Sequence, residues 1–128
     1  MPPAAVPGKP PTHALEGVYE LKKRVAAGQD EAQPSRGYLA ITNRHMFLCL
    51  VGPGTDPEQP LLRSGVRTWR PDAELMRCEL KLGYFTDSKG GIHLERPGTP
   101  EARRVELARG RLRIFQDMKS YLEFERIE

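Results

Sequence analysis

Apolar and polar side chains alternate without a break along Glu74–Phe85, and this pattern restricts the folds that are open to the chain. The even positions from 76 to 84 carry Met, Cys, Leu, Leu and Tyr, whereas positions 77, 79 and 81 carry Arg, Glu and Lys. A helix over these residues would bring Glu79 onto its apolar stripe and leave Leu80 outside it. A period of two is typical of a strand with one buried face. We therefore predict a strand over 75–86.

Short turns join further alternating segments. A two-residue hairpin turn at 109–110, where Gly supplies a positive φ, would pair Leu107 with Leu112 and Val105 with Ile114. Apolar residues then face apolar residues, and a slip of one position would destroy the match. Turns at 43–44 and 88–90 give four more predicted cross-strand pairs: Ile41 with Met46, Leu39 with Leu48, Tyr84 with Leu94, and Thr86 with Ile92.

The pattern predicts about eight strands, which we place at 16–25, 36–42, 45–51, 65–70, 75–86, 91–96, 103–108 and 111–117, with 120–128 as a ninth or closing strand. The short links favour antiparallel neighbours, and closure removes both exposed sheet edges. We therefore predict an all-β, antiparallel up-and-down β-barrel. Its expected inward residues are Leu39, Ile41, Met46, Leu48, Met76, Cys78, Leu80, Leu82, Tyr84, Leu94, Leu107, Leu112 and Ile114; Glu79, Glu95 and Glu106 are expected to face outward.

Length and composition agree with one folded domain. The chain has 128 residues, and five prolines fall within residues 1–12, which predicts a disordered N-terminal arm followed by a single domain at 13–128. No apolar run reaches the roughly 20 residues that cross a bilayer, and the N-terminus lacks the apolar segment of a signal peptide. The expected location is a bacterial cytoplasm.

Charges and cysteines point to no metal or nucleic acid. The net charge of +3 is spread along the chain among acidic neighbours, so nucleic-acid binding is not expected. Cys49 and Cys78 lack the spacing and companion ligands of a zinc site, so we expect two buried free thiols. No cofactor motif is present, and no metal site is predicted.

The two ends of the chain resemble a known family. Near the start, LEGVYEL contains Gly17 and Tyr19, and near the finish YLEFERI contains Arg126. This resembles the lipocalin and wider calycin pattern, in its compact bacterial form, in which a Gly-x-Trp in the first strand closes the barrel floor and a late arginine lies over the ring. The resemblance implies that Gly17, Tyr19 and Arg126 close the barrel. Tyr stands here in place of Trp.

The inside of the barrel is the candidate binding site. If 72–73 is a two-residue turn, Trp69 pairs with Met76 and Arg67 pairs with Cys78 on the inward side. An inward arginine among apolar walls would seek a carboxylate or an anionic ligand. Alternatively, 65–70 is a loop or helical turn and Arg67 is solvated. The predicted ligand-binding residues are Arg67, Trp69, Met76, Cys78 and Tyr84.

The outer face of two strands is also apolar. Tyr38, Ala40, Phe47 and Cys49 lie on the side opposite the inward residues of 36–42 and 45–51. Such a face is normally covered. We expect either a short helix at 56–63 folded back over it, or a homodimer through the face of Tyr38, Phe47 and Cys49.

Three functions are compatible with these features. The leading hypothesis is a small-molecule binding protein whose ligand is largely apolar, with or without an anionic group. The second is a cofactor-free isomerase or cyclase on the same barrel, with Tyr38 and Tyr84 as candidates to polarise a carbonyl; catalysis is neither predicted nor excluded. The third is an interaction module of the pleckstrin-homology or GRAM type for proteins or lipids. That class ends in a long helix, whereas 120–128 alternates like a strand; a short helix over 118–127 is the alternative.

Overall fold

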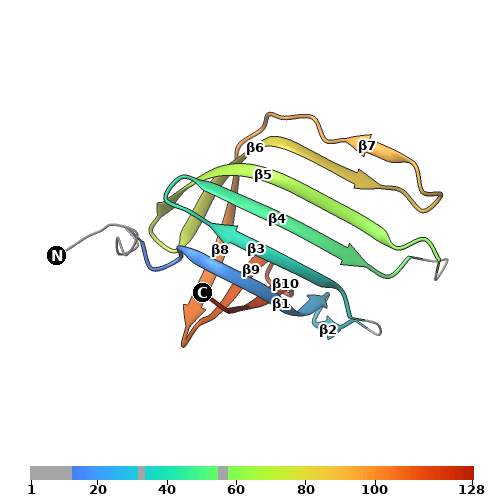
Figure 1. The fold of residues 1–128 in the computed structure, drawn as a ribbon. Helices are drawn as coiled ribbons and strands as arrows, with labels where there is room; N and C mark the ends of the chain where they lie inside the picture. The colour runs from blue at the N-terminus through green and yellow to red at the C-terminus, as the bar shows by residue number, and fades with distance from the viewer. Residues whose placement is uncertain (1–12, 32–33, 55–57) are drawn as a thin grey trace.

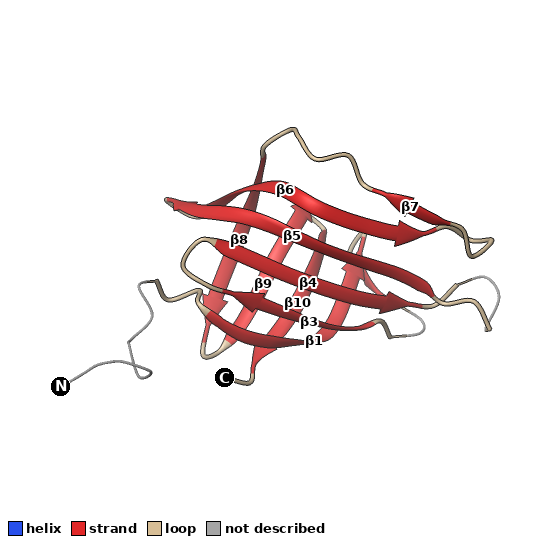
Figure 2. Ribbon diagram, turned by 45° about the horizontal axis from the view of Figure 1, so that its top comes forward, coloured by secondary structure: helices blue, strands red, loops and turns tan. Residues whose placement is uncertain are grey.

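The computed structural model describes residues 13–31, 34–54 and 58–128, and in these ranges strands joined by turns make up the fold, with no helix (Figure 1 and Figure 2). The predicted arm at 1–12 lies outside the described residues. The strands are β1 (Gly17–Ala26), β2 (Gln29–Asp30), β3 (Arg36–Ile41), β4 (His45–Gly52), β5 (Leu61–Asp72), β6 (Leu75–Thr86), β7 (Ile92–Leu94), β8 (Glu101–Ala108), β9 (Arg111–Asp117) and β10 (Ser120–Arg126).

The strands close into a barrel. Antiparallel pairing runs in the order β10-β9-β8-β6-β5-β4-β3-β1, and β1 pairs with β10 to complete a ring of eight strands. In Figure 1, β3 to β6 form the near wall, and β8, β9 and β10 cross behind them. The predicted up-and-down barrel is confirmed. The strand expected at 91–96 is reduced to β7, which pairs only with β6 and lies outside the ring.

The predicted hairpins have the expected register. Leu107 pairs with Leu112 across a turn in which Arg109 and Gly110 have φ angles of 54° and 79°. Both angles are positive, as a two-residue turn that continues the strand twist requires. Val105 pairs with Ile114 in the same hairpin. The pairs predicted at the other two turns are also confirmed: Ile41 with Met46, Leu39 with Leu48, Tyr84 with Leu94, and Thr86 with Ile92.

Two predictions around β5 are wrong. The turn after β5 is at 73–74, so Trp69 pairs with Cys78 and Arg67 pairs with Leu80. Ala73 adopts a φ of 54° in this turn. Alanine rarely takes this conformation, so the sequence did not predict the position of the turn. In addition, β5 begins at Leu61, so residues 61–63 are strand rather than helix, and residues 56–57 lie outside the described residues.

A β-bulge in β6 inverts the inward and outward faces of its second half. Val66 pairs with Leu82 and Arg67 with Leu80, which leaves Lys81 as the extra residue. Because side chains alternate with a period of two, one inserted residue moves every later side chain to the opposite face. The predictions that Leu82, Tyr84 and Leu94 face inward are therefore wrong. They are 65%, 41% and 80% exposed.

The core fills one end of the barrel. It consists of Leu15, Tyr19, Leu21, Leu39, Ile41, Met46, Trp69, Met76, Cys78, Leu112 and Phe124. Residues from the first and last strands, Tyr19 and Phe124, are among its fully buried side chains, so closure of the ring and formation of the core depend on each other. The opposite end carries the turn between β6 and β7 and the loop between β4 and β5.

Acid should loosen the turn between β6 and β7. The Asp87 carboxylate contacts the His93 ring at 2.6 Å and accepts the N–H groups of Gly91 and Lys89, each at 2.9 Å. These contacts, the His93 contact first, lower the pKa of Asp87 from 3.8 to about 2. A lowered folded-state pKa means that this stabilisation is present above 3.8 and is lost as the pH falls through about 2.

Carbon-13 NMR of the side-chain carboxyl groups measures this titration directly. We expect the Asp87 signal to titrate well below the ordinary aspartate range, and Asp87→Asn to increase amide exchange at Gly91 even at neutral pH. An Asp87 midpoint near 3.8 would contradict the assigned contacts.

Candidate ligand-binding site

A cavity of about 510 Å³ extends from the core to the end of the barrel opposite Tyr19. Pockets of this size hold small organic molecules. The cavity is lined by Arg24, Glu31, Ser35, Leu39, Met46, Leu48, Leu50, Gly52, Pro53, Leu61, Leu62, Arg63, Arg67, Met76, Cys78, Phe85, Thr86, Glu95, Glu101, Arg103, Ile114, Gln116, Leu122 and Phe124. Strands from every part of the ring contribute to it.

The closed end of the barrel is sealed by a turn at 13–16 and two residues from the terminal strands. The Tyr19 hydroxyl donates to the Leu15 carbonyl at 2.7 Å and accepts from Nη2 of Arg126 at 2.8 Å. The same guanidinium donates to the Ala14 and Glu16 carbonyls and lies 5.3 Å from the Tyr19 ring centre. Burial raises the pKa of Tyr19, so the phenol stays neutral and can donate.

Gly17 is needed where the first and last strands meet. A Cβ on this residue would lie 2.8 Å from the Glu128 carbonyl oxygen and 3.0 Å from Nε of Arg126. The structure therefore brings Gly17, Tyr19 and Arg126 together at the closed end. Neither these residues nor the turn at 13–16 lines the cavity.

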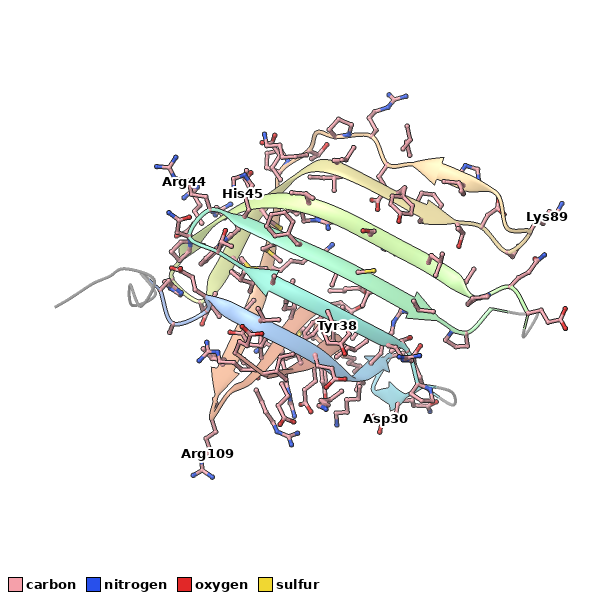
Figure 3. All side chains as sticks on the ribbon, viewed as in Figure 1. Asp30, Tyr38, Arg44, His45, Lys89 and Arg109 are labelled. Carbon is pink, nitrogen blue, oxygen red and sulfur yellow. The ribbon has the colours of Figure 1, made fainter. Side chains whose placement is uncertain are left out.

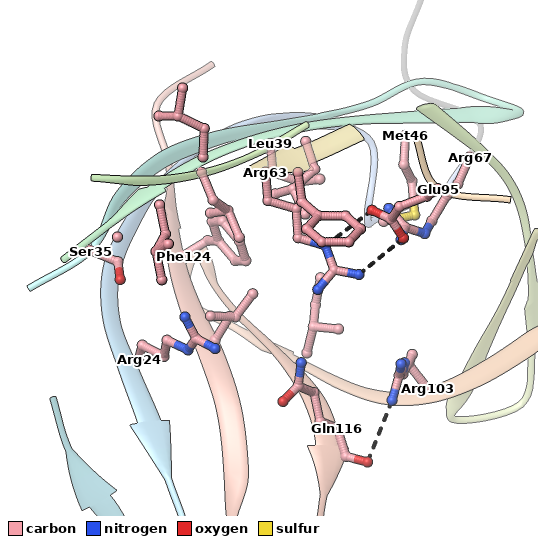
Figure 4. Close-up of a pocket in the computed structure, with 18 of the residues that line it drawn as sticks. Arg24, Ser35, Leu39, Met46, Arg63, Arg67, Glu95, Arg103, Gln116 and Phe124 are labelled. Carbon is pink, nitrogen blue, oxygen red and sulfur yellow. Dashed lines mark hydrogen bonds and ion pairs between the residues drawn. The ribbon is translucent and has the colours of Figure 1, made fainter. Parts of the chain in front are cut away.

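Four arginines and three glutamates line the cavity. Figure 4 shows Arg63, Arg67, Arg103 and Glu95 on one side of it and Phe124 on the other. Most of the carbon-rich lining comes from β3, β4, β9 and β10, whereas most of the charged residues lie on β5, β8 and the segment after β7. The charged residues thus gather mainly on one side of the cavity, although Arg24 lies near Phe124 on the other.

The charges inside the cavity do not balance. Arg24 pairs with Glu31 at 3.9 Å, and Arg63 donates to both carboxylate oxygens of Glu95 at 3.3 and 3.2 Å. Glu101 forms ion pairs with two arginines, Arg103 at 2.9 Å and Arg67 at 4.0 Å.

Arg67 is therefore the cation with the weakest partner. Its side chain is 14% exposed, less than the 30%, 43% and 50% of Arg103, Arg24 and Arg63. A guanidinium held this far from water is stabilised by an additional anion. The four arginines and three glutamates leave a net charge of +1 for a ligand to neutralise.

Two β-bulges turn charged residues into the cavity. In β1, Leu21 pairs with Phe124 and Lys23 with Glu123, so Lys22 is the extra residue and Arg24 shares the inward face with Leu21. The bulge in β6 also changes which residues of the neighbouring segment after β7 face inward. Glu95, which was expected to face outward, lines the cavity and binds Arg63. Bulges re-aim side chains next to binding sites in many sheets.

Three of the five predicted ligand-binding residues line the cavity: Arg67, Met76 and Cys78. Trp69 lies in the core instead, where its indole N–H donates to the Thr42 carbonyl at 2.7 Å. Tyr84 lies on the outer face because of the bulge at Lys81. Arg67 is in a regular strand, so of its two expected environments the inward one is correct.

Several lining residues were missed by sequence analysis, namely Arg24, Arg63, Glu95, Glu101 and Arg103. A sequence signal existed for Arg103 alone, since it shares strand parity with Val105 and Leu107. The other four depend on bulges or on the exact bounds of strands, which local patterns define poorly.

The two cysteines should differ sharply in reactivity. Cys49 is exposed on the outer face, which corrects the expectation that both are buried, whereas Cys78 is buried beside the cavity. Burial, followed by the nearby Glu101 carboxylate, raises the pKa of Cys78, and a neutral thiol is a poor nucleophile. We expect maleimide to modify one thiol in the folded protein and the second only after unfolding. Peptide mapping that found Cys78 labelled at the rate of Cys49 would contradict the inward placement.

Comparisons with protein-family models, with curated proteins and with solved structures gave no match. The closed antiparallel barrel is compatible with a lipocalin-like fold. Within 13–31, 34–54 and 58–128, no cluster of three or more His, Cys, Asp or Glu side chains could hold a metal ion. The same residues include no helix with the length and apolar character needed to span a membrane.

Proposed function

We propose that this protein binds a small, largely apolar molecule that carries one anionic group, inside the barrel. The observation that carries the proposal is the unequal charge of the cavity, in which Arg67 and Arg103 share the carboxylate of Glu101. A carboxylate ligand would give Arg67 its own partner, and charge-assisted hydrogen bonds of this kind contribute about 1.5–3 kcal/mol.

The cavity also sets the size and orientation of the ligand. A volume of 510 Å³ corresponds to roughly 17 waters at about 30 Å³ each, and the ligand should have a comparable number of non-hydrogen atoms or fewer. The anionic end would face Arg67, and the apolar end would contact Leu39, Leu122 and Phe124. A medium-chain carboxylate such as decanoate satisfies both conditions.

Kinship with the lipocalin-like proteins is part of the same proposal. It is supported by the antiparallel barrel and by the contact between Tyr19 of the first strand and Arg126 of the last. The homodimer expected from the sequence would form through the outer face of the barrel. It does not involve the cavity and is proposed separately below.

The two alternative functions gain no comparable support. Tyr38 and Tyr84, the candidates for polarising a carbonyl, are 52% and 41% exposed on the outer face, so neither reaches a molecule in the cavity. The segment at 120–126 is strand β10 and closes the ring, in place of the helix that a pleckstrin-homology or GRAM module carries there.

Isothermal titration calorimetry with matched ligands tests the proposal. Decanoate and decan-1-ol have the same chain, and only decanoate is charged at neutral pH. We expect decanoate to bind about 10- to 100-fold more tightly, as one charge-assisted hydrogen bond with Arg67 implies. Equal affinity for the two compounds would remove the anionic part of the proposal, and the absence of binding by either would remove the whole.

A further inference from the structure

The outer side of strands β3 to β7 carries apolar residues that take no part in the core of the barrel. We define the outer apolar face as Tyr38, Ala40, Phe47, Cys49, Ser64, Val66, Leu82, Tyr84 and Leu94. These residues form two cross-strand rows in direct register: Ala40, Phe47, Val66 and Leu82 in one, and Tyr38, Cys49, Ser64, Tyr84 and Leu94 in the other. Neither row contains a carboxylate, a lysine or an arginine. Figure 3 shows Tyr38 on this wall.

The bulge at Lys81 extends this face from β5 onto β6 and β7. Without it, Leu82 and Tyr84 would point into the barrel, and Gly83 and Phe85 would take their places on the outside. With it, the surface continues across β6 and β7, where Leu82, Tyr84 and Leu94 are 65%, 41% and 80% exposed. The bulge therefore turns Phe85 toward the cavity and exposes Leu82, Tyr84 and Leu94 in exchange, and an exposed apolar surface of this kind usually marks an interaction site.

The opposite wall of the barrel is built differently. There the outward ring of Phe115 is only 7% exposed, because the Arg104 guanidinium lies 3.9 Å from its centre and Tyr121 packs at 5.1 Å. Glu123 on the same wall is paired with Arg111 and Arg113. The chain therefore covers its own outward aromatic residues on one wall, and leaves those of the outer apolar face uncovered within the described residues.

The shape of the outer apolar face fits a second copy of the chain. A groove of about 280 Å³ crosses β1, β3, β4 and β5, lined by Val18, Tyr38, Leu39, Ala40, Phe47, Leu48, Cys49, Ser64, Gly65 and Val66. The exposed side chains of Leu82, Tyr84 and Leu94 form a ridge directly beside it, since Val66 pairs with Leu82 and Ser64 with Tyr84. A twofold axis between groove and ridge places the ridge of each copy in the groove of the other.

We propose that the protein forms a twofold homodimer through the outer apolar face, with the ridge of Leu82, Tyr84 and Leu94 seated in the groove of the partner. Five strands about 4.8 Å apart, and two rows of outward residues about 6.7 Å apart, give a footprint of roughly 320 Å² per copy. This is smaller than the standard interface of a specific complex, so we expect a weak, transient dimer. The two rows carry no charge, so they cannot attract an acidic or basic protein electrostatically. A second copy, whose matching surface is equally uncharged, is the better fit.

Sedimentation velocity of the full chain over about 10 to 500 µM tests the dimer. The mass should rise with concentration from 14.4 kDa towards twice that value. Leu82→Glu and, independently, Leu94→Glu should remain monomeric throughout, because each places a charge on the ridge. Met118→Glu is the matched control: Met118 is 89% exposed outside this face, and the variant should dimerise like the wild type.

The binding of decanoate separates the dimer from the cavity. Both ridge variants should retain the decanoate affinity of the wild type, because their side chains do not line the cavity. A wild-type protein that stays monomeric at the highest concentration would overturn the proposal. So would a dimer that Leu82→Glu and Leu94→Glu leave intact. Flotation of a monomer with neutral phosphatidylcholine vesicles would assign the face to lipid instead.

Discussion

Replacing Tyr19 by alanine should lower the free energy of unfolding by about 3–5 kcal/mol, as for other large buried aromatic residues. The side chain is 0% exposed, and it fills the closed end of the barrel where the first and last strands meet. Its removal would leave a cavity and would also deprive the Arg126 guanidinium of one of its acceptors. Chemical denaturation followed by circular dichroism measures the change.

Tyr19→Phe separates the ring from the hydroxyl in this experiment. It keeps the packing and removes only the hydrogen bonds to Leu15 and Arg126, so a loss of about 1–3 kcal/mol is expected. A loss below about 1 kcal/mol for Tyr19→Ala would show that the ring does not seal the barrel. Equal losses for the two variants would show that the hydroxyl alone matters.

Arg67→Met should weaken the binding of decanoate by about 10- to 100-fold while leaving that of decan-1-ol nearly unchanged. Methionine keeps a long side chain in the cavity and removes only the cation. The stability of the unliganded protein should be unchanged or higher, because Arg67 is largely buried and its only ion pair among the described residues spans 4.0 Å. Titration calorimetry and denaturation of the same variant measure both effects.

Arg70→Met is the matched control for this variant. It lies on the same strand, removes the same charge and is exposed on the outer side. The control should bind decanoate like the wild type. If both variants lost affinity equally, the effect would come from the net charge of the protein, and the assignment of Arg67 as the anion-binding residue would fail.

Sequence alternation predicted most of the barrel because its register depends on local features. Leu107 and Leu112 face each other across a turn that Gly110 permits, and this information lies within six consecutive positions. Closure was harder, since Tyr19 and Arg126 are 107 residues apart. Only a resemblance between the ends of the chain and a known family suggested that they meet.

The bulges account for most of the errors. Nothing in the run from Leu80 to Leu82 marks Lys81 as an inserted residue, because the alternation continues through it. A weak signal follows at Gly83, where an inward Cβ would lie 3.1 Å from Leu80 and 3.2 Å from the Ser64 carbonyl oxygen. A bulge depends on contacts across the strands, so the inward placement of Arg24 and Glu95 and the exposure of the ridge were both beyond local reasoning.

The methyl groups of the methionines give the most direct test of ligand binding inside the barrel. Met46 and Met76 line the cavity, whereas Met118 is 89% exposed on the outside and serves as an internal control. In a decanoate titration followed by NMR of carbon-13-labelled methionine methyls, the signals of Met46 and Met76 should shift together and saturate, and that of Met118 should stay in place. Unmoved Met46 and Met76 signals, at decanoate concentrations that saturate the calorimetric binding, would contradict a ligand site inside the barrel.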